Sequence, residues 1–456
     1  MASHPHPLEQ TFAQAMAALP QHAKVAVAFS GGLDSSVLVH LLHGYAVGRS
    51  FTMHAFHVHH GLSANADAWA EHCRTVCNGL SVPFDERRVA VERDAGTGVE
   101  EAARTARYAA LGAMCAEHGI ELLLTAHHID DQAETVLLQM LRGSGIAGIA
   151  GMESCNRAPA LLGNADLTIA RPLLERARVE LEDYARARGI ANIEDESNTD
   201  TRYARNALRH TVMPVLERHF PGFAARFART ARHAHAAQSL LDEIARDDLA
   251  QCRAGDALDL ERIAPLSEER AENLYRHWFA ERGLRMPSTA WLKEMRSQLT
   301  LAKAEAQLCV THPDCHIRRH RNRVYIVPRE DGRELPTPQE FVWNGEASLY
   351  FPAFRGSLFF EAAQEGIAAE WLRGRNCTIH LRQGGERLKL APNRPSRNLK
   401  QHFQTHDVPA WERETLPQVS SAGELLYAAG LGMDCRRAGQ AGEACILLRW
   451  QSDLIS

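Results

Sequence analysis

Residues 24–36 read K-V-A-V-A-F-S-G-G-L-D-S-S, and this stretch decides the fold of the first half of the chain. The apolar run Lys24–Phe29 is typical of a buried strand, and the residues over Asp34–His43 have the periodicity of a helix. Between them lies a serine-glycine-glycine turn. Glycines let the backbone approach a ligand closely, and free amides at a helix N-terminus bind anions. The stretch therefore predicts a strand, an anion-binding loop over Ser30–Ser36, and a helix.

The same alternation of a short strand and a helix continues along the chain. Further strands are predicted at residues 51–58, 83–91 and 121–126, and helices at residues 65–80, 99–118 and 130–141. Alternation at this spacing requires crossover connections, so the strands should form a parallel sheet with helices on both faces. The predicted fold class is α/β, with a Rossmann-like doubly wound sheet. Ligands of such sheets bind at the carboxyl ends of the strands.

The pattern changes after Pro214. Residues 223–303 read as mostly helix, residues 308–310 and 324–327 as paired strands, and from about residue 340 short strand-like pieces follow (349–351, 358–360 and 378–381). We therefore predict three domains: a catalytic domain over 1–218, a mainly helical middle domain over 219–340, and a small α+β domain over 341–456.

The composition excludes several classes of protein. The chain has 456 residues, 45% of them apolar, and a formal charge of −5, so it can build cores. No apolar run is long enough to span a membrane, and residues 1–10 do not resemble a secretory signal, so we predict a cytoplasmic protein. Only five of the 51 basic residues are lysines. No glycine precedes a lysine, which excludes a Walker A loop.

The ten cysteines include no C-x-x-C pair. Cys73 and Cys77 are the closest in sequence, at helical i,i+4 spacing, so we expect free thiols in a reducing compartment and no zinc or iron–sulfur cluster. Three histidines, His57, His59 and His60, end the second predicted strand. Neighbouring strand residues point to opposite faces, so a metal site formed by all three is disfavoured.

A second motif follows the fourth predicted strand. Residues 127–135 read H-H-I-D-D-Q-A-E-T, and on a helix Asp131 and Glu134 share one face. Stacked carboxylates repel unless a cation lies between them, such as Mg²⁺ or an ammonium group. A capped, solvated first turn of a helix is the alternative. The stretch Arg142–Gly145 (R-G-S-G) forms a second turn that could bind an anion.

The motif S-G-G-x-D-S resembles the pyrophosphate loop of the N-type ATP pyrophosphatases, the PP-loop superfamily. The resemblance implies that the loop binds ATP through Ser30, Gly31, Gly32, Leu33, Asp34, Ser35 and Ser36. The two later motifs, H-H-x-D-D-Q-x-E-T and R-G-S-G, together resemble those of the tRNA(Ile)-lysidine synthetases, which belong to this superfamily. Further stretches match that family in order, at residues 57–62, 98–108, 171–174, 195–214, 382–387 and 400–411.

The resemblance implies a two-step reaction with ATP and Mg²⁺ as cofactors. In that family the O2 of the wobble cytidine attacks the α phosphate of ATP, and the ε-amine of free lysine then attacks C2 and expels AMP. The implied catalytic residues are Asp34, Asp131, Glu134 and His127, with Asp131 and Glu134 as magnesium ligands. Candidates for lysine, cytidine or phosphate are His60, Arg104, Arg107, Arg142, Gly143, Ser144, Gly145 and Arg205. How the carboxylates divide between Mg²⁺ and lysine stays open, and Arg205 as an exposed helix arginine is an alternative.

Three arginine-rich windows follow residue 200, and basic surface binds nucleic acid. The predicted tRNA-binding residues are Arg209, Arg226, Arg229, Arg319, Arg321, Arg323, Arg387, Arg397 and Lys400. Aromatic residues in these windows (Tyr325, Phe403 and Trp411) could stack on unpaired bases. A solvated charged face is the alternative for each window.

The expected partners are tRNA(Ile) with a CAU anticodon and free L-lysine, with no membrane, and a homodimer is an open alternative to a monomer. Two other functions remain: a tRNA thiolase on the same scaffold, or a catalytically inactive tRNA-binding protein. Thiolases of this superfamily carry C-x-x-C pairs or a catalytic thiol, and Cys155 is the cysteine nearest the second motif.

Overall fold

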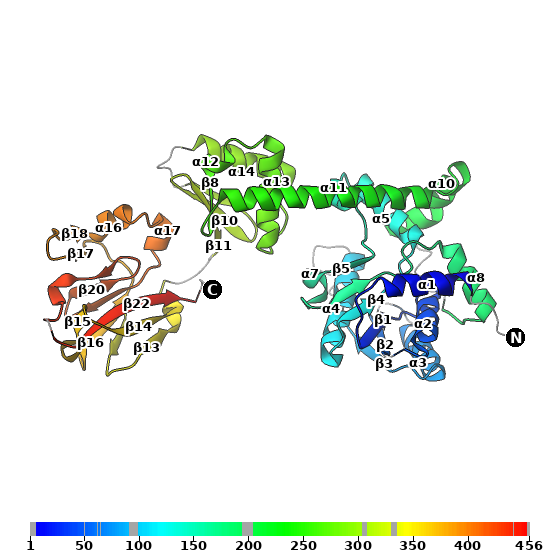
Figure 1. The fold of residues 1–456 in the computed structure, drawn as a ribbon, viewed down its shortest axis with the longest axis horizontal. Coiled ribbons are helices and arrows are strands. Elements are labelled where there is room, and N and C mark those ends of the chain that lie inside the picture. Colours follow the sequence, from blue (N-terminus) through cyan, green and yellow to red (C-terminus); the bar gives the residue numbers. More distant parts are fainter. Residues whose placement is uncertain are drawn as a thin grey trace. The chain divides into compact units, whose positions relative to one another are not determined.

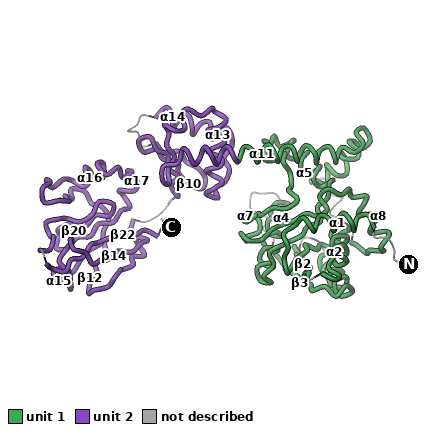
Figure 2. The backbone as a smooth tube through the Cα atoms, viewed as in Figure 1, with its two compact units in different colours: residues 1–242 green, residues 243–456 purple. Residues whose placement is uncertain are grey.

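A computed structural model describes residues 6–49, 51–61, 63, 65–90, 99–193, 204–302, 308–329, 335–440 and 442–453. The chain divides into two compact units, residues 1–242 and 243–456, coloured separately in Figure 2. The division falls inside the long helix α11 (Phe223–Cys252). The predicted boundary at residue 218 lies before this helix, because the sequence shows where the strand pattern ends and not where contacts divide.

The first unit is built on one sheet of six strands in the order β3-β2-β1-β4-β6-β5 (Figure 1). The strands are β1 Lys24–Ala28, β2 Thr52–His59, β3 Phe84–Arg88, β4 Leu122–Leu124, β5 Cys155–Arg157 and β6 Thr168–Ala170. All neighbours pair in parallel except β5, which is antiparallel to β6. The predicted parallel sheet is confirmed, and the short edge strand β5 is an addition to it.

Helices cover both faces of this sheet. The described helices of the first unit before α11 are α1 Pro7–Ala17, α2 Leu33–Ala46, α3 Ala66–Gly79, α4 Val99–His118, α5 Ile129–Leu141, α6 Ile146–Ile149, α7 Pro159–Leu162, α8 Arg178–Arg188, α9 Ala204–Ala207 and α10 Met213–His219. Val25 and Val27 pack in one core cluster with α1, α2 and α8. Ala26 packs in another with α4. Alternate residues of β1 therefore face opposite helical layers, as a doubly wound sheet requires.

The second unit begins with helices packed on a five-stranded antiparallel sheet of order β7-β8-β11-β10-β9. Its elements are β7 Arg253–Ala254, β8 Ala257–Asp259, α12 Leu260–Ile263, α13 Glu268–Glu281, α14 Thr289–Leu301, β9 Cys309–Thr311, β10 Cys315–His320 and β11 Arg323–Pro328. The two strands predicted as a pair do not pair directly. Strand β10 lies between them and pairs with both, which corrects that prediction.

The rest of the second unit has its own core, separate from that of the helices before it. Two main antiparallel sheets have the orders β12-β16-β19-β20-β21 and β13-β14-β22-β15, and β17 pairs with β18. The strands are β12 Gln339–Val342, β13 Ser348–Phe351, β14 Gly356–Ala363, β15 Ile367–Ala368, β16 Asn376–His380, β17 Arg387–Leu388, β18 Arg397–Asn398, β19 Gln418–Ser421, β20 Glu424–Ala428, β21 Gly432–Met433 and β22 Cys445–Ser452. Three short helices accompany them, α15 Ala369–Leu372, α16 Leu399–Thr405 and α17 Ala410–Arg413. This is the predicted α+β region.

In the described part of the chain, no helix is both long and apolar enough to cross a membrane.

Candidate active site

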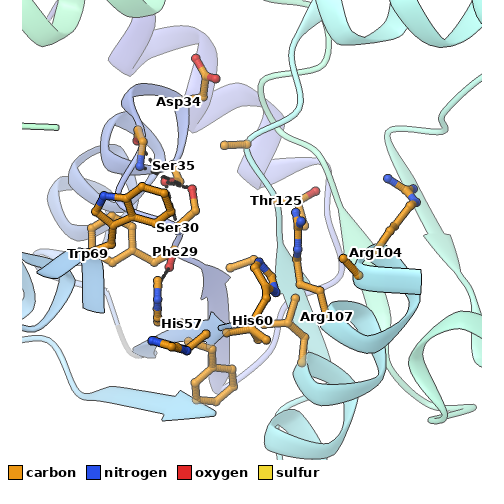
Figure 3. Close-up of a pocket in the computed structure, with 18 of the residues that line it drawn as sticks. Phe29, Ser30, Asp34, Ser35, His57, His60, Trp69, Arg104, Arg107 and Thr125 are labelled. Carbon is orange, nitrogen blue, oxygen red and sulfur yellow. Dashed lines mark hydrogen bonds between the residues drawn. The ribbon is translucent and has the colours of Figure 1, made fainter. Parts of the chain in front are cut away.

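A cavity of about 770 Å³ opens where strands β1, β2 and β4 end (Figure 3). This is the edge of the sheet where ligands were expected. Its lining includes ten of the predicted site residues: Ser30, Gly32, Asp34, Ser35, His60, Arg104, Arg107, His127, Asp131 and Arg205. The loop after β1, helix α4 and the start of α5 therefore meet around one space.

The loop after β1 is held by its own serines. The Ser35 hydroxyl donates to the Gly32 carbonyl at 3.0 Å and lies 3.0 Å from the Ser30 hydroxyl. The buried Ser36 hydroxyl donates to the Gly31 carbonyl at 3.2 Å. These bonds fix the shape of the loop, and Gly32, Asp34 and Ser35 line the cavity at the start of α2. Amides at the start of a helix can bind phosphate oxygens.

Gly31 meets two requirements that no other residue type meets. Its φ is +86°, which L side chains rarely adopt. A Cβ at this position would also lie 2.8 Å from Cδ1 of Ile193 and 3.0 Å from Sγ of Cys73. The Gly31 carbonyl in turn accepts the backbone N–H of Ile193 at 2.9 Å. Gly31 therefore allows the loop to pack closely against Ile193 and Cys73.

His128 is buried among three carboxylates. Its Nε2 lies 3.3 Å from Asp131 and 3.7 Å from Asp34, and its Nδ1 lies 3.4 Å from Asp130. At these distances the groups form ion pairs, but neither ring nitrogen of His128 makes a well-aligned hydrogen bond with a described residue. Burial disfavours the charged ring, but the surrounding carboxylates outweigh it and raise the pKa of His128 to about 10. An imidazolium therefore holds the two cavity carboxylates, Asp34 and Asp131, near each other.

Arg209 closes the other side of the carboxylate group. Its Nε donates to Glu134 at 2.6 Å, and its Nη2 donates to Glu134 at 3.0 Å and to Asp131 at 2.9 Å. Glu134 is only 2% exposed. Burial raises the pKa of Glu134, and the guanidinium opposes that rise. Arg209 was predicted to bind tRNA; the structure instead places it inside this site, because Glu134 is a buried charge that needs a partner.

The same contacts bear on the predicted magnesium ligands. Both oxygens of Glu134 are already bonded to Arg209, and Glu134 does not line the cavity. Asp131 and Asp34 do line it, and Oδ1 of Asp34 is a buried oxygen without a hydrogen-bond partner among the described residues. Asp34 therefore fits a cation better than Glu134 does. It lies beside Asp131, whose two oxygens also accept from Arg209 and from the backbone N–H of His128.

His127 faces the cavity as a neutral ring. Its Nδ1 lies 2.9 Å from the Thr125 hydroxyl. Burial, together with nearby arginines that include Arg104, lowers the pKa of His127 to about 3. At neutral pH this ring has one N–H donor and one acceptor nitrogen, but it lacks the second proton that an imidazolium could give as a general acid.

The remaining residues of the second motif support the site. Gln132 exchanges two hydrogen bonds with the backbone of Met152, at 2.8 and 2.9 Å. Asp130 accepts the backbone N–H of Arg178 at 2.9 Å, at the start of α8. The Thr135 hydroxyl accepts from Arg205 at 3.2 Å. Arg205 is half-buried and lines the cavity, so the alternative of a fully exposed helix arginine does not hold.

The turn at 142–145 is not part of the cavity lining. Helix α5 separates it from Asp131 by about 17 Å along the axis, at roughly 1.5 Å per residue. The Ser144 hydroxyl donates to Gln139 at 2.6 Å, and Arg142 is exposed. The prediction that Arg142, Gly143, Ser144 and Gly145 contact substrate in this cavity is therefore not supported. The family-like stretch 195–200 lies outside the described residues.

Trp69 and Thr125 are among the residues that line the cavity but were not predicted as site residues. Figure 3 shows Trp69 beside the serine loop. Trp69 lies in the first turn of α3, the helix that follows β2, and Thr125 directly follows β4, so both lie at the carboxyl edge of the sheet. That position in the alternation was the signal that could have found them.

The predicted tRNA-binding residues fall into two groups. Exposed side chains belong to Arg226, Arg229, Arg321, Arg323, Arg387, Arg397 and Lys400. Arg319 does not fit the prediction, because it is 9% exposed and donates to the carbonyls of Leu299, Ala302 and Arg321. Arg319 therefore donates to carbonyls at the C-terminal end of α14, where the last carbonyls of a helix lack a partner within the helix.

The aromatic residues of these windows also pack inside the second unit. Phe403 is 1% exposed and belongs to a core cluster, so it cannot stack on a base. The rings of Tyr325 and Trp411 contact each other at a centroid distance of 5.4 Å. Asp407 lies 2.9 Å from His320 and 2.8 Å from Arg321. These contacts join the middle and C-terminal parts of the second unit.

Comparison with known proteins agrees with this fold and loop. A family model described as a PP-loop domain matches residues 5–216, so the first unit is a PP-loop domain. Models of a TilS substrate binding domain and a TilS substrate C-terminal domain match residues 258–325 and 377–450.

Two relatives are similar over most of their length. A tRNA(Ile)-lysidine synthase of Ralstonia nicotianae is 42% identical, over 90% of this chain and 89% of its own. One of Alkalilimnicola ehrlichii is 40% identical, over 97% of each chain. The chain belongs to the tRNA(Ile)-lysidine synthase family.

Proposed function

We propose that this protein ligates free lysine to C2 of the wobble cytidine of tRNA(Ile), using ATP and releasing AMP and pyrophosphate. One observation carries the proposal: the serine-glycine loop, the paired carboxylates Asp34 and Asp131, and the cationic side chains Arg104, Arg107 and Arg205 line one cavity. The loop suits the phosphates of ATP, and the carboxylates suit an ammonium or a cation. The names of the relatives agree with this substrate pair.

Residues that line the cavity can hold the phosphates of ATP and the ammonium of lysine. Amides after Gly31 bind the leaving pyrophosphate, and the arginines on α4 balance charge that develops on phosphate. Mg²⁺ would be held by Asp34 with Asp131, and it would stabilise the charge of the leaving group. The orphaned oxygen of Asp34 is the observation that fits this ion. Asp131 can also bind the lysine ammonium, since its neighbours keep its pKa low and its carboxylate charged, although burial alone would raise that pKa.

The proposal is tested by incubating the protein with a tRNA(Ile) transcript that has a CAU anticodon, ATP with Mg²⁺, and labelled lysine. We expect lysine to enter the tRNA with one AMP and one pyrophosphate released per lysine. If no lysine is incorporated, and a sulfur donor instead supports pyrophosphate release and thiolation, the protein is a thiolase.

The cavity lining disfavours the thiolase alternative. None of the described residues that line the cavity is a cysteine. Burial raises the pKa of the Cys73 thiol, which lies beside Gly31, to about 12, so it carries little thiolate. Cys155 lies half-buried on β5. Replacing Cys155 with alanine should leave lysine incorporation unchanged, whereas a thiolase that depends on this thiol would lose activity.

A further inference from the structure

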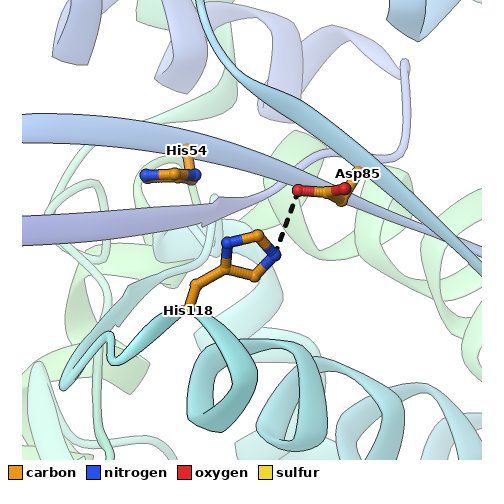
Figure 4. Close-up of side chains that lie close together, drawn as sticks. All are labelled: His54, Asp85 and His118. Atoms are coloured by element: carbon orange, nitrogen blue, oxygen red, sulfur yellow. Dashed lines mark ion pairs between the residues drawn. The ribbon is translucent and has the colours of Figure 1, made fainter.

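Three side chains with metal-ligating atoms meet on the first unit, outside the cavity. His54 lies near the start of β2, Asp85 lies on β3, and His118 ends helix α4 (Figure 4). His54 and Phe56 share one face of β2, and Asp85 is the register partner of Phe56 on β3. Helix α4 covers this face, where Phe56 packs with Met114. The cluster therefore follows from the topology. It lies toward the amino ends of β2 and β3, whereas the cavity lies at the carboxyl end of β2.

The geometry of the cluster is compact. One ligand atom of each side chain lies within 4.8 Å of the other two. His118 Nε2 lies 3.2 Å from a carboxylate oxygen of Asp85, and the two imidazole rings have centroids 5.3 Å apart. All three residues are half-buried.

His54 supplies a second, independent observation. Its Nδ1 is buried and has no hydrogen-bond partner among the described residues. The ion pair between His118 and Asp85 accounts for the positions of those two side chains. It does not account for the burial of Nδ1 of His54. Such a nitrogen normally costs free energy unless a donor or a metal satisfies it.

We propose that His54, Asp85 and His118 bind a transition-metal dication of the zinc class. Two imidazoles and a carboxylate suit Zn²⁺ and its neighbours in the first transition row, whereas Mg²⁺ and Ca²⁺ prefer oxygen ligands alone. At metal–ligand distances of about 2.1 Å, the donor atoms must approach to roughly 3.4 Å in a tetrahedron. Side-chain rotation supplies this small closure, and a water molecule completes the coordination.

The surrounding charges limit the affinity of this site. Lys24 donates to the carbonyl of His118 at 2.8 Å. Burial, His118 and Lys24 together lower the pKa of His54, against the opposing charge of Asp85. His54 is therefore a neutral ligand at pH 7, but Lys24 repels a dication, so binding depends on all three ligands together.

We expect a bound metal ion to stabilise helix α4 and to take no part in catalysis. A bound ion ties the last residue of α4 to strands β2 and β3. The same helix carries Arg104 and Arg107 into the cavity. Metal binding therefore stabilises the helix that presents these arginines, by the usual linkage between ligand binding and folding.

The test measures zinc binding to the full-length protein after chelation of bound metals and alkylation of accessible thiols, since Cys309 is exposed. In equilibrium dialysis with Zn²⁺ alone, the wild type should bind one more equivalent of Zn²⁺ per chain than His54→Ala or His118→Ala binds. The matched control His233→Ala removes an exposed imidazole and should keep that equivalent. Because protons compete with a metal for its ligands, this equivalent should bind more weakly as the pH is lowered.

A second measurement separates loss of the site from loss of folding. Zn²⁺ should raise the unfolding midpoint of the wild type and of His233→Ala, while Asp85→Asn, which keeps the side-chain shape, should bind at least tenfold more weakly and show a smaller shift. Equal zinc stoichiometry and equal stabilisation in the wild type and in every variant would overturn the proposal.

Discussion

Arg209 holds Glu134 with two hydrogen bonds across 75 residues of sequence, Nε to Oε1 at 2.6 Å and Nη2 to Oε2 at 3.0 Å. Arg209 lies in a π-helical turn, Leu208–Val212, between α9 and α10. Such turns widen a helix by one residue and occur often at functional sites. The turn brings the guanidinium to the buried face of α5, where it also contacts Asp131. The carboxylates of the second motif are therefore arranged by a segment far along the chain.

Arg209→Ala should destabilise the protein by about 3–5 kcal/mol, because it leaves the charge of Glu134 buried without a partner. Calorimetric unfolding of the first unit measures this loss. Arg229→Ala, which removes an exposed arginine of α11, should change stability by no more than about 0.5 kcal/mol. Adding Glu134→Gln to Arg209→Ala should restore part of the loss. If the two single arginine variants are equally stable, the pair does not stabilise the fold.

His128 gives a stability signal at alkaline pH. Its pKa in the folded protein is about 10, above the 6.5 of a free imidazole. A raised pKa means that the folded state holds the proton more tightly, so its contribution is complete below pH 6.5 and is lost as the pH rises through 10. The unfolding midpoint of the wild type should fall between pH 7 and pH 10 more steeply than that of His128→Asn.

The neighbouring His127 is the matched control for that measurement. Its pKa is lowered to about 3, so it stays neutral throughout the interval from pH 7 to pH 10. His127→Asn should therefore keep the wild-type slope. Equal slopes for the wild type and His128→Asn would show that the buried ring is not charged.

The sequence predicted the parallel sheet and its ligand edge because each strand–helix unit repeats the same local pattern. It missed strand β10, whose residues read C-H-I-R-R-H. Cys315, Ile317 and Arg319 are the buried side chains of that strand. A buried arginine breaks the alternation of apolar and polar residues on which strand prediction depends. Three backbone carbonyls accept from this arginine, two at the end of α14 and one from Arg321, and they explain its burial.

The candidate site was predictable in part for a similar reason. Local spacing identifies Asp34 and Asp131 as residues at the carboxyl ends of strands, and both line the cavity. Local spacing also placed Glu134 and the turn at 142–145 in the site, because neighbours on a helix look equivalent in sequence. The burial of Glu134 and its pairing with Arg209 are tertiary facts that no local pattern contains.

Asp34→Asn and Asp131→Asn should each lower lysine incorporation by on the order of 100- to 10,000-fold, the usual range for a charged group that acts on the reacting atoms. Affinity for tRNA should hold, because the change keeps side-chain shape and lies in the ATP cavity. Asp183→Asn is the control, since Asp183 is exposed and pairs with Arg186 in the same helix, α8. Wild-type rates in both cavity variants would remove these carboxylates from the reaction.

Gly31→Ala should weaken ATP binding by at least tenfold. An alanine at φ +86° costs about 1–2 kcal/mol, and its Cβ collides with Ile193. Gly48→Ala is the control outside the loop, because Gly48 also has a positive φ, +76°, and none of the described atoms lies within 4 Å of the place that a Cβ would take. Titration with ATP should show normal affinity for Gly48→Ala. Normal affinity for Gly31→Ala as well would mean that the loop does not bind the nucleotide.

The arginines of the β10–β11 hairpin should separate into two kinds when tRNA binding is measured against salt. Arg321 and Arg323 are exposed, so replacing both with alanine should weaken binding and lower the slope of log affinity against log salt by up to about 2. Arg319→Ala should instead lower the unfolding midpoint, since three backbone carbonyls lose their donor. Its salt slope, measured below that midpoint, should match the wild type. If Arg319→Ala flattens the slope and the double variant does not, the buried arginine and not the exposed pair reaches the tRNA.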